Sequence, residues 1–232
     1  MAMVKKYLAG VVQVDNLVEG IYTVKLKSLS GPFRFFPGQF LHLALDEYDP
    51  SSGWPESRCF SMQSSPSEDL IRITFAVKGN FTRRMQRDLT QGRQVNIKLP
   101  YGDLFLKPHN KMNTVFIAGG TGITPFLSLF TSQWFQGYTN PRIYLGFRSR
   151  HHNIYNDELN LLKTGVTNLS PCDPKIFYED KTGRLDINQI YLENGPGSDY
   201  FISGPPTMIK GFKENLILNG VPASQILTDD WE

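Results

Sequence analysis

The chain has few of the residues from which metal centres and disulfide frameworks are built. Its two cysteines, Cys59 and Cys172, are far apart in the sequence, and neither belongs to a CxxC pair. An iron–sulfur cluster or a structural zinc site needs several thiolates or imidazoles at characteristic spacing. We therefore expect no metal site in this chain, and any metal redox centre that it serves must lie on another chain.

Long apolar runs and concentrated basic segments are missing as well. No stretch approaches the ~20 apolar residues of a membrane-spanning helix, and polar residues interrupt residues 1–18 in a way that does not suit a signal peptide. The 24 Lys and Arg nearly balance the 22 Asp and Glu, and no basic stripe could follow a nucleic acid backbone. We expect a cytoplasmic protein with no membrane span and no nucleic acid partner.

Apolar and aromatic residues are plentiful. Hydrophobic residues make up 40% of the 232 residues, and there are 16 Phe, 10 Tyr and 3 Trp, which excludes global disorder. At roughly 100 to 200 residues per domain, two modest domains explain this length better than one.

Residues 1–107 have the pattern of an antiparallel β domain. Short runs rich in β-branched and aromatic residues alternate with turns, and several show the period-two alternation of half-buried strands. This favours a small β-barrel or sandwich. One helix is expected over residues 81–89, with Asn80 as its N-cap. The predicted strands are residues 11–14, 21–26, 40–45, 71–77 and 95–99.

Residues 108–232 change to an alternation of strands and helices. This order is typical of right-handed βαβ units and predicts an α/β domain with a parallel sheet of about five strands. The predicted strands are residues 114–118, 143–147, 176–178, 200–203 and 225–227, and the predicted helices are residues 126–135, 157–162, 185–192 and 207–219.

A glycine-rich segment follows the first predicted strand of the second domain and opens a helix. Glycines let a backbone approach an anion, and the free N–H groups of a helix N-terminus favour negative charge, so a pyrophosphate fits this segment. It is neither GxGxxG nor a P-loop, which disfavours ATP chemistry. A tight turn that needs glycine for its geometry is the alternative. The segment consists of Gly119, Gly120, Thr121, Gly122, Ile123, Thr124 and Pro125.

The predicted strand Arg58-Cys59-Phe60-Ser61 combines a cation, an aromatic ring and a hydroxyl. Alternation puts Arg58 and Phe60 on one face, with Ser61 beside them at the strand end. Such a set could pair with a phosphate, stack on a planar ring and hydrogen-bond a ring nitrogen. An ordinary strand with Phe inside and Arg outside has the same pattern.

Two further clusters follow. Gly79-Asn80-Phe81-Thr82 begins the predicted helix of the first domain and offers either a second anion site or simple helix capping. Ser203-Gly204-Pro205-Pro206-Thr207-Met208 lies at the carboxyl end of a predicted parallel strand, the edge at which open α/β sheets bind ligands. Thr207 is expected to cap the helix that follows.

The order RCFS, GNFT, GGTGITP, SGPPTM resembles the ferredoxin–NADP reductase superfamily. Pro37-Gly38-Gln39-Phe40 and Tyr101-Gly102-Asp103 strengthen the resemblance, which covers most of the chain. It implies an antiparallel β-barrel FAD-binding domain, residues 1–107, followed by an α/β parallel-sheet domain for a nicotinamide nucleotide, residues 108–232.

The resemblance also implies roles for individual residues. Arg58 would pair with the FAD pyrophosphate, Phe60 would pack on the isoalloxazine, where the family more often has Tyr, and Ser61 would hydrogen-bond near flavin N5. Ser203 replaces the Cys common near the nicotinamide. Further cofactor-binding residues would be Cys59, Ala76, Val77, Lys78, Gly79, Asn80, Phe81 and Thr82 for FAD, and Gly119, Gly120, Thr121, Gly122, Ile123, Thr124, Pro125, Gly204, Pro205 and Met208 for the nucleotide.

Trp231 is expected to lie over the flavin, because several family members close the nicotinamide face of the ring with a terminal aromatic residue. Ser61, Ser203 and Trp231 are thus the residues expected at the reaction centre. A frayed, solvated end beside Asp229 and Asp230 is the alternative for Trp231.

The implied activity is hydride transfer from NADH or NADPH to FAD, followed by electron transfer to a separate ferredoxin, flavodoxin or oxygenase component. A flavin or ferric reductase acting on free flavins or iron, and a flavin-binding module without turnover, remain alternatives. Arg148 and Arg150 could pair with the 2′-phosphate of NADPH, or be simply solvated. Glu179 and Asp180 would repel that phosphate and accept bonds from free ribose hydroxyls, which narrowly favours NADH.

Overall fold

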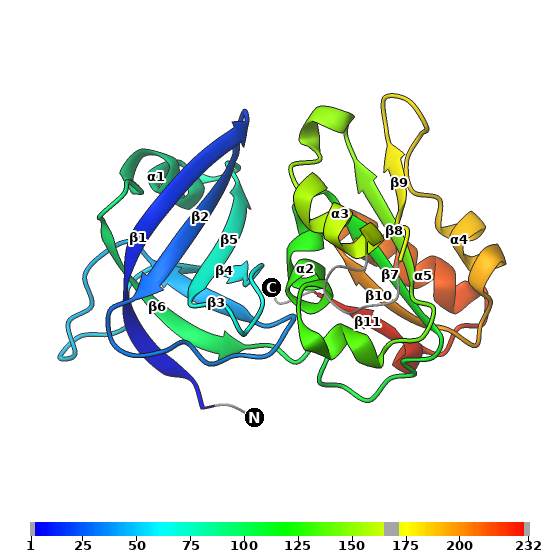
Figure 1. Ribbon diagram of the computed structural model, residues 1–232, viewed down its shortest axis with the longest axis horizontal. Helices are drawn as coiled ribbons and strands as arrows, with labels where there is room; N and C mark the ends of the chain where they lie inside the picture. The colour runs from blue at the N-terminus through cyan, green and yellow to red at the C-terminus, as the bar shows by residue number, and fades with distance from the viewer. Residues whose placement is uncertain (1–2, 165–171, 230–232) are drawn as a thin grey trace. The chain divides into compact units, whose positions relative to one another are not determined.

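The structure, a computed structural model, describes residues 3–164 and 172–229. The chain forms two compact units, Met1–Asp103 and Leu104–Glu232 (Figure 1). Their hydrophobic cores are separate. The sequence predicted a boundary at residue 107, but Leu104 and Phe105 are already buried in the core of the second unit. These two apolar side chains therefore bring the chain into that unit before Pro108.

The first unit is a six-stranded antiparallel sheet with the strand order β4-β3-β6-β1-β2-β5. Beyond β4, the Gln63 N–H donates to the carbonyl of Arg72 in β5 at 2.8 Å, which links the two edge strands of the sheet. The elements are β1 (Lys5–Val18), β2 (Ile21–Ser28), β3 (Phe40–Ala44), β4 (Ser57–Ser61), β5 (Leu70–Ala76), α1 (Asn80–Asp88) and β6 (Gln94–Tyr101).

Strand β5 shows the predicted alternation in part. Ile71, Ile73 and Phe75 are buried and Arg72 is half-buried, although Thr74 on the other face is buried as well. Burial of alternate side chains lets one face of the strand pack into the core. The first strand, β1, is longer than predicted because its two halves have different partners: Lys5–Gly10 pairs with β6, and residues from Ala9 onward pair with β2.

Helix α1 begins at Asn80, so the prediction that Asn80 is the N-cap was wrong. Gly79 occupies the cap position, and the Thr82 hydroxyl accepts the N–H groups of Gly79 at 3.0 Å and Lys78 at 2.9 Å. Asn80 instead accepts a hydrogen bond from Arg83 at 2.8 Å. The threonine hydroxyl thus binds N–H groups that precede the helix, and none of the described side chains caps the first turn.

The second unit is a five-stranded parallel sheet with the order β11-β10-β7-β8-β9. Its elements are β7 (Thr114–Gly119), α2 (Thr124–Phe130), β8 (Arg142–Phe147), α3 (Asn156–Thr164), β9 (Lys175–Tyr178), α4 (Ile187–Asn194), β10 (Asp199–Ser203), α5 (Pro206–Leu218) and β11 (Ile226–Thr228), with short 3₁₀ turns at Gly120–Ile123, Gln133–Gly137, Arg150–His152 and Ala223–Gln225. The fold class, an antiparallel domain followed by a parallel α/β domain, is confirmed.

Successive side chains of β7 enter two different cores. Phe116 and Ala118 pack in the cluster that contains α2 and α3, and Val115 and Ile117 pack in the cluster that contains α4 and α5. The central strand is therefore covered by helices on both faces, and its continuous apolar sequence follows from this position.

The helix predicted over residues 126–135 ends early, at Phe130. The hydroxyls of Thr131 and Ser132 donate to the carbonyls of Leu127 and Leu129, each at 2.8 Å. Side chains that bond to the backbone in this way compete with helix continuation. The next residues form the 3₁₀ turn Gln133–Gly137.

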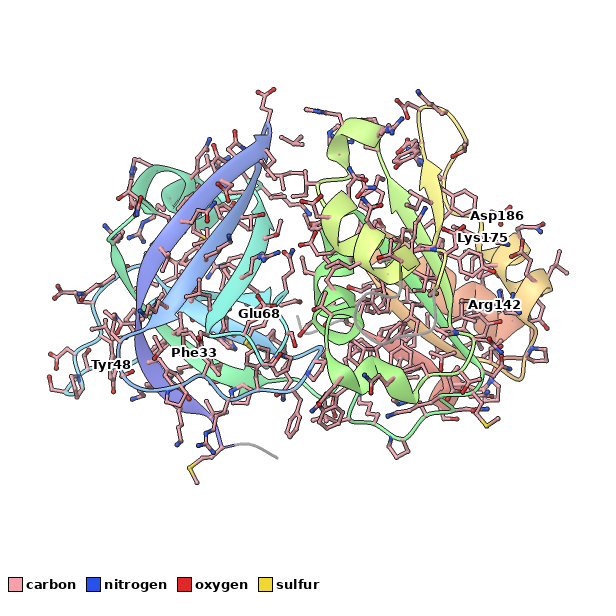
Figure 2. All side chains as sticks on the ribbon, in the orientation of Figure 1. Phe33, Tyr48, Glu68, Arg142, Lys175 and Asp186 are labelled. Atoms are coloured by element: carbon pink, nitrogen blue, oxygen red, sulfur yellow. The ribbon has the colours of Figure 1, made fainter. Side chains whose placement is uncertain are left out.

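Polar contacts position α4. Asp186, labelled in Figure 2, caps the helix, because its carboxylate accepts the N–H groups of Asn188 at 2.9 Å and Gln189 at 3.4 Å. At the other end of α4, Glu193 Oε2 accepts hydrogen bonds from Lys175 Nζ at 2.7 Å and from the Tyr144 hydroxyl at 2.6 Å. These hydrogen bonds, with Lys175 contributing most, lower the pKa of Glu193 to about 2. The ionised carboxylate ties α4 to β8 and β9.

Among residues 3–164 and 172–229, none of the helices has both the length and the apolar character needed to cross a lipid bilayer.

Candidate active site

The glycine-rich segment lies at the carboxyl end of β7, the central strand of the parallel sheet. The sequence predicted that this segment opens an α-helix directly, but a 3₁₀ turn, Gly120–Ile123, comes first. Helix α2 then starts at Thr124, with Pro125 in its first turn as expected. Gly120 has a φ of 55° and is exposed, and no atom lies within 4 Å of a Cβ built on it. Its backbone is thus open to a ligand.

Two of the predicted clusters pack directly against each other. A Cβ built on Gly122 would lie 2.5 Å from both Cα and N of Gly204, and one built on Gly119 would lie 2.8 Å from Sδ of Met208. The strands that precede the two loops are neighbours, since Ala118 of β7 is in register with Ser203 of β10. Glycine is needed at residue 122 because the two backbones nearly touch.

Ser203 is 1% exposed, and its hydroxyl donates to Asp229 Oδ2 at 3.2 Å. The Asp229 N–H donates in turn to the Ile202 carbonyl at 3.0 Å, which extends the pairing of β10 and β11 by one residue beyond Thr228. Sequence reasoning counted Asp229 only as part of a solvated end. Its contact with Ser203 is a tertiary feature that no local pattern signals.

The segment Ser203–Met208 continues into helix α5, whose start differs from the prediction. Helix α5 starts at Pro206 with Pro205 as the cap residue, so Thr207 lies inside the first turn and does not cap the helix. Trp231, expected over the flavin, lies outside the described residues, and its role stays a prediction.

The two arginines and two carboxylates proposed for nucleotide selection come from neighbouring strand ends. The Asp180 N–H donates to the carbonyl of Arg148 at 3.3 Å, and Arg150 is exposed at the start of a short turn. Glu179 is paired with Arg184, which donates to its Oε1 through two nitrogens at 2.5 and 2.9 Å. This hydrogen bonding lowers the pKa of Glu179, with a further contribution from the charge of Arg148. Arg184 was missed because it follows a loop beyond β9.

In the first unit, Arg58 lies beside the first turn of α1. Its guanidinium carbon is 5.1 Å from the centre of the Phe81 ring, a cation–π contact. NH2 donates to Glu56 at 2.9 Å and NH1 donates to the Ser57 carbonyl at 2.8 Å. The structure thus brings Arg58 together with the Gly79–Thr82 cluster, which is separate from it in the sequence.

The N-terminus of α1 has the donors of an anion site. The first hydrogen bond of the helix runs from the Arg83 N–H to the Gly79 carbonyl at 3.0 Å, so the N–H groups of Asn80, Phe81 and Thr82 precede the first intrahelical donor. A Cβ built on Gly79 would meet no atom within 4 Å. Arg58, exposed Lys78 and these N–H groups form a donor set that suits a phosphate.

The remaining residues of the β4 motif are less open. Phe60 is 8% exposed, with its ring 6.2 Å from that of Phe75, and Ser61 is also 8% exposed. The Cys59 thiol faces His42, with Sγ 3.5 Å from Nε2. Burial, aided by the charge of Lys98, lowers the pKa of His42. In the next strand, Ala76 ends β5 and the Val77 N–H donates to the Gly20 carbonyl at 2.8 Å.

The histidines have structural surroundings. His109 contacts the Lys107 carbonyl and the Tyr138 hydroxyl, each at 2.7 Å, and His152 contacts the Ser149 hydroxyl at 2.8 Å. Within the two described stretches of the chain, no group of three or more His, Cys, Asp or Glu side chains could hold a metal ion.

Comparisons with known proteins agree with this architecture. The family model of the oxidoreductase NAD-binding domain matches residues 116–214. The reductase component of propane 2-monooxygenase from Rhodococcus jostii is 26% identical over 235 residues, covering 94% of this chain and 62% of that protein. The electron transfer component of toluate 1,2-dioxygenase from Pseudomonas putida is 25% identical over 228 residues, covering 93% and 64% respectively. The chain thus spans less than two thirds of the length of these relatives.

A solved structure covers both units. The ferredoxin NADP+ reductase from Neisseria gonorrhoeae, with bound FAD and NADP, superimposes with a TM-score of 0.76 over 97% of this chain and 98% of that one, at 18% identity. The sequence match in the second unit and the two-unit fold agree with the family inferred from the four motifs. Residues 116–214 of the second unit match the oxidoreductase NAD-binding domain family, and the chain has the two-unit fold of the ferredoxin NADP+ reductase structure.

Proposed function

We propose that this chain is an FAD-dependent NAD(P)H oxidoreductase that passes electrons to a separate protein. The observation that carries the proposal is the close packing of the Gly119–Pro125 loop on Gly204 at the carboxyl edge of the parallel sheet. That edge is where open α/β sheets bind nucleotides, and the residues lie within the segment matched by the NAD-binding family model.

The second unit would hold the nicotinamide nucleotide. The exposed backbone of Gly120 and the adjoining residues to Pro125 would face its pyrophosphate, and Gly204, Pro205 and Met208 would line the nicotinamide end. The hydrogen bond to Asp229 fixes the hydroxyl of Ser203, so this side chain would orient the ring without taking up a proton. Arg148 and Arg150 would lie near the adenosine ribose.

The first unit would hold FAD. Arg58, Lys78 and the start of α1, Gly79–Thr82, supply positive charge and N–H donors for a pyrophosphate. Cys59, Phe60, Ser61, Ala76 and Val77 would follow the isoalloxazine side of the same site. Bound FAD supplies the conversion of a two-electron hydride donor into one-electron steps. The protein's own task is to bind, orient and shield the reacting rings, so no side-chain general base is required.

A redox partner on another chain is the proposed acceptor. The relatives from Rhodococcus jostii and Pseudomonas putida are named as components of oxygenase systems. Their names support an oxygenase component, a ferredoxin or a flavodoxin as the electron acceptor. The cytoplasmic location expected from the sequence belongs to the same proposal.

Two measurements test the function. Flavin released by acid from freshly purified protein should chromatograph as FAD, and FMN would contradict the proposed pyrophosphate site. Steady-state NADH oxidation should be faster with ferredoxin or flavodoxin than with free FMN or ferric citrate. The opposite order would identify a flavin or ferric reductase, and no turnover with any acceptor would identify a flavin-binding module.

A further inference from the structure

Four charged side chains form one network beside the proposed FAD phosphate site. Arg84 of α1 donates to Asp46 Oδ1 at 2.6 Å and to Oδ2 at 3.3 Å, and it lies 3.9 Å from Glu56 Oε2. The other oxygen of Glu56 accepts the hydrogen bond from Arg58 at 2.9 Å. We call these four residues the Glu56 network.

The network has no net charge, because its two arginines face two carboxylates. Arg84 is already satisfied by Asp46, and this bidentate contact lowers the pKa of Asp46, with the hydrogen bond as the largest cause. Arg58 is the cation of the network that lies against the Phe81 ring at the first turn of α1, so it is the one placed to meet a phosphate there. Its nearest charged partner is Glu56, and both side chains are about half exposed, at 53% and 52%.

Glu56 occupies one of the Arg58 donors that an anion would use. A guanidinium has five N–H groups, of which one binds Glu56 and one binds the Ser57 carbonyl. The contact with the Phe81 ring holds the guanidinium beside the start of α1 whether or not Glu56 carries a charge. A phosphate that pairs with Arg58 would thus stand close to the Glu56 carboxylate, and like charges at this distance repel.

We propose that Glu56 sets the affinity for FAD by competing with its pyrophosphate for Arg58. The inference rests on the proposed function and adds to it an acidic residue that opposes cofactor binding. Removal of the Glu56 charge leaves the network with one net positive charge beside the N–H groups of α1. FAD should then bind more tightly, and it should associate faster, since steering by a positive site raises association rates.

The test is titration of FAD into the full-length protein after its flavin has been removed, followed by quenching of flavin fluorescence. Glu56→Gln keeps a carbonyl oxygen that can accept from Arg58 and removes the charge. Its dissociation constant for FAD should fall about two- to fivefold, the range that a surface ion pair supports. The ratio of the wild-type and Glu56→Gln dissociation constants should approach one as salt is raised from about 10 mM to about 1 M, because the Debye length shrinks from about 30 Å to about 3 Å.

Two variants serve as controls. Glu47→Gln makes the same change of charge at an exposed position of the same loop and should leave the FAD affinity within experimental error. Glu56→Asp keeps the charge and should bind FAD like the wild type. The melting temperature of each flavin-free variant should match that of the wild type, which separates an effect on binding from an effect on folding.

The possible results are distinct. Weaker or unchanged binding by Glu56→Gln, or equal tightening by Glu47→Gln, would overturn the inference while leaving the FAD site intact. A wild-type protein that binds no FAD would overturn the proposed function and the inference together. Tighter, salt-dependent binding that is specific to Glu56→Gln supports the inference.

Discussion

Replacement of Gly122 by Ala should damage the second unit through one contact that the structure defines. The new Cβ would lie 2.5 Å from Cα and N of Gly204 and 2.7 Å from the carbonyl carbon of Ser203. All three atoms belong to the backbone, so no flexible side chain can move aside. The loops that carry the proposed nucleotide site must separate.

The cost can be estimated from overpacking in protein cores, which typically amounts to about 1–3 kcal/mol. For a protein of this size, each kcal/mol lowers the melting temperature by roughly 2–4 °C. Gly122→Ala should therefore melt several degrees below the wild type in scanning calorimetry or circular dichroism. The Michaelis constant for the nicotinamide nucleotide should rise as well, because both loops shift.

Two matched glycines separate the causes. Gly120→Ala meets no neighbouring atom but strains a residue with a φ of 55°, a cost of about 1–2 kcal/mol. Gly79→Ala is neither crowded nor in the left-handed region and should be nearly neutral for stability. A Gly122→Ala protein with wild-type stability and nucleotide kinetics would refute the proposed packing of the two loops.

Three further predictions follow from charged contacts. Arg58→Ala should weaken FAD binding about tenfold or more, since a hydrogen bond from a charged group contributes ~1.5–3 kcal/mol. The urea midpoint of the flavin-free protein should stay nearly constant. A loss of stability as large as the loss of FAD affinity would contradict this role for Arg58. We expect the wild type to prefer NADH. Arg184→Ala should strengthen that preference, because it frees the Glu179 carboxylate. A kcat/KM tenfold higher for NADPH than for NADH, about 1.4 kcal/mol, would show that Arg148 and Arg150 outweigh the carboxylates. Glu193 has a lowered pKa, so its contribution to stability is present above its unfolded pKa, about 4.3, and is lost as pH falls through the folded value of about 2. The free energy of unfolding of Glu193→Gln should therefore fall less steeply with decreasing pH over that range than that of the wild type. Equal slopes for the two proteins would argue that the contact between Glu193 and Lys175 does not stabilise the fold.

Much of the architecture could be predicted because hydrophobic periodicity reports which faces of a strand are buried. The alternation in β5 and the continuous apolar sequence of β7 gave the correct class for each unit. Element ends were harder to predict, since they depend on side chains that bond to the backbone. Gly79 is the N-cap of α1 where Asn80 was expected, with its N–H bound by the Thr82 hydroxyl, and Thr131 helps to end α2 before its predicted limit.

Part of the candidate site could also be predicted from the sequence, and part could not. Gly122 and Gly204 could be singled out because glycine clusters at strand ends are visible in one sequence, and their mutual contact follows from the parallel pairing of β7 and β10. Glu56, Arg184 and Asp229 were not recognised as partners of site residues. Each contacts the site only through tertiary structure, and isolated charged residues on loops carry no local pattern.

The most direct test of the central claim is the flavin absorbance of the purified protein when a reduced nicotinamide nucleotide is added without oxygen. We predict that absorbance near the long-wavelength flavin maximum falls in a single turnover, at a rate that saturates with nucleotide concentration, and returns when an oxidised acceptor protein is added. Saturation is expected because the nucleotide must first bind at the Gly119–Pro125 loop. A protein that contains FAD but keeps its full absorbance with both NADH and NADPH would contradict the account.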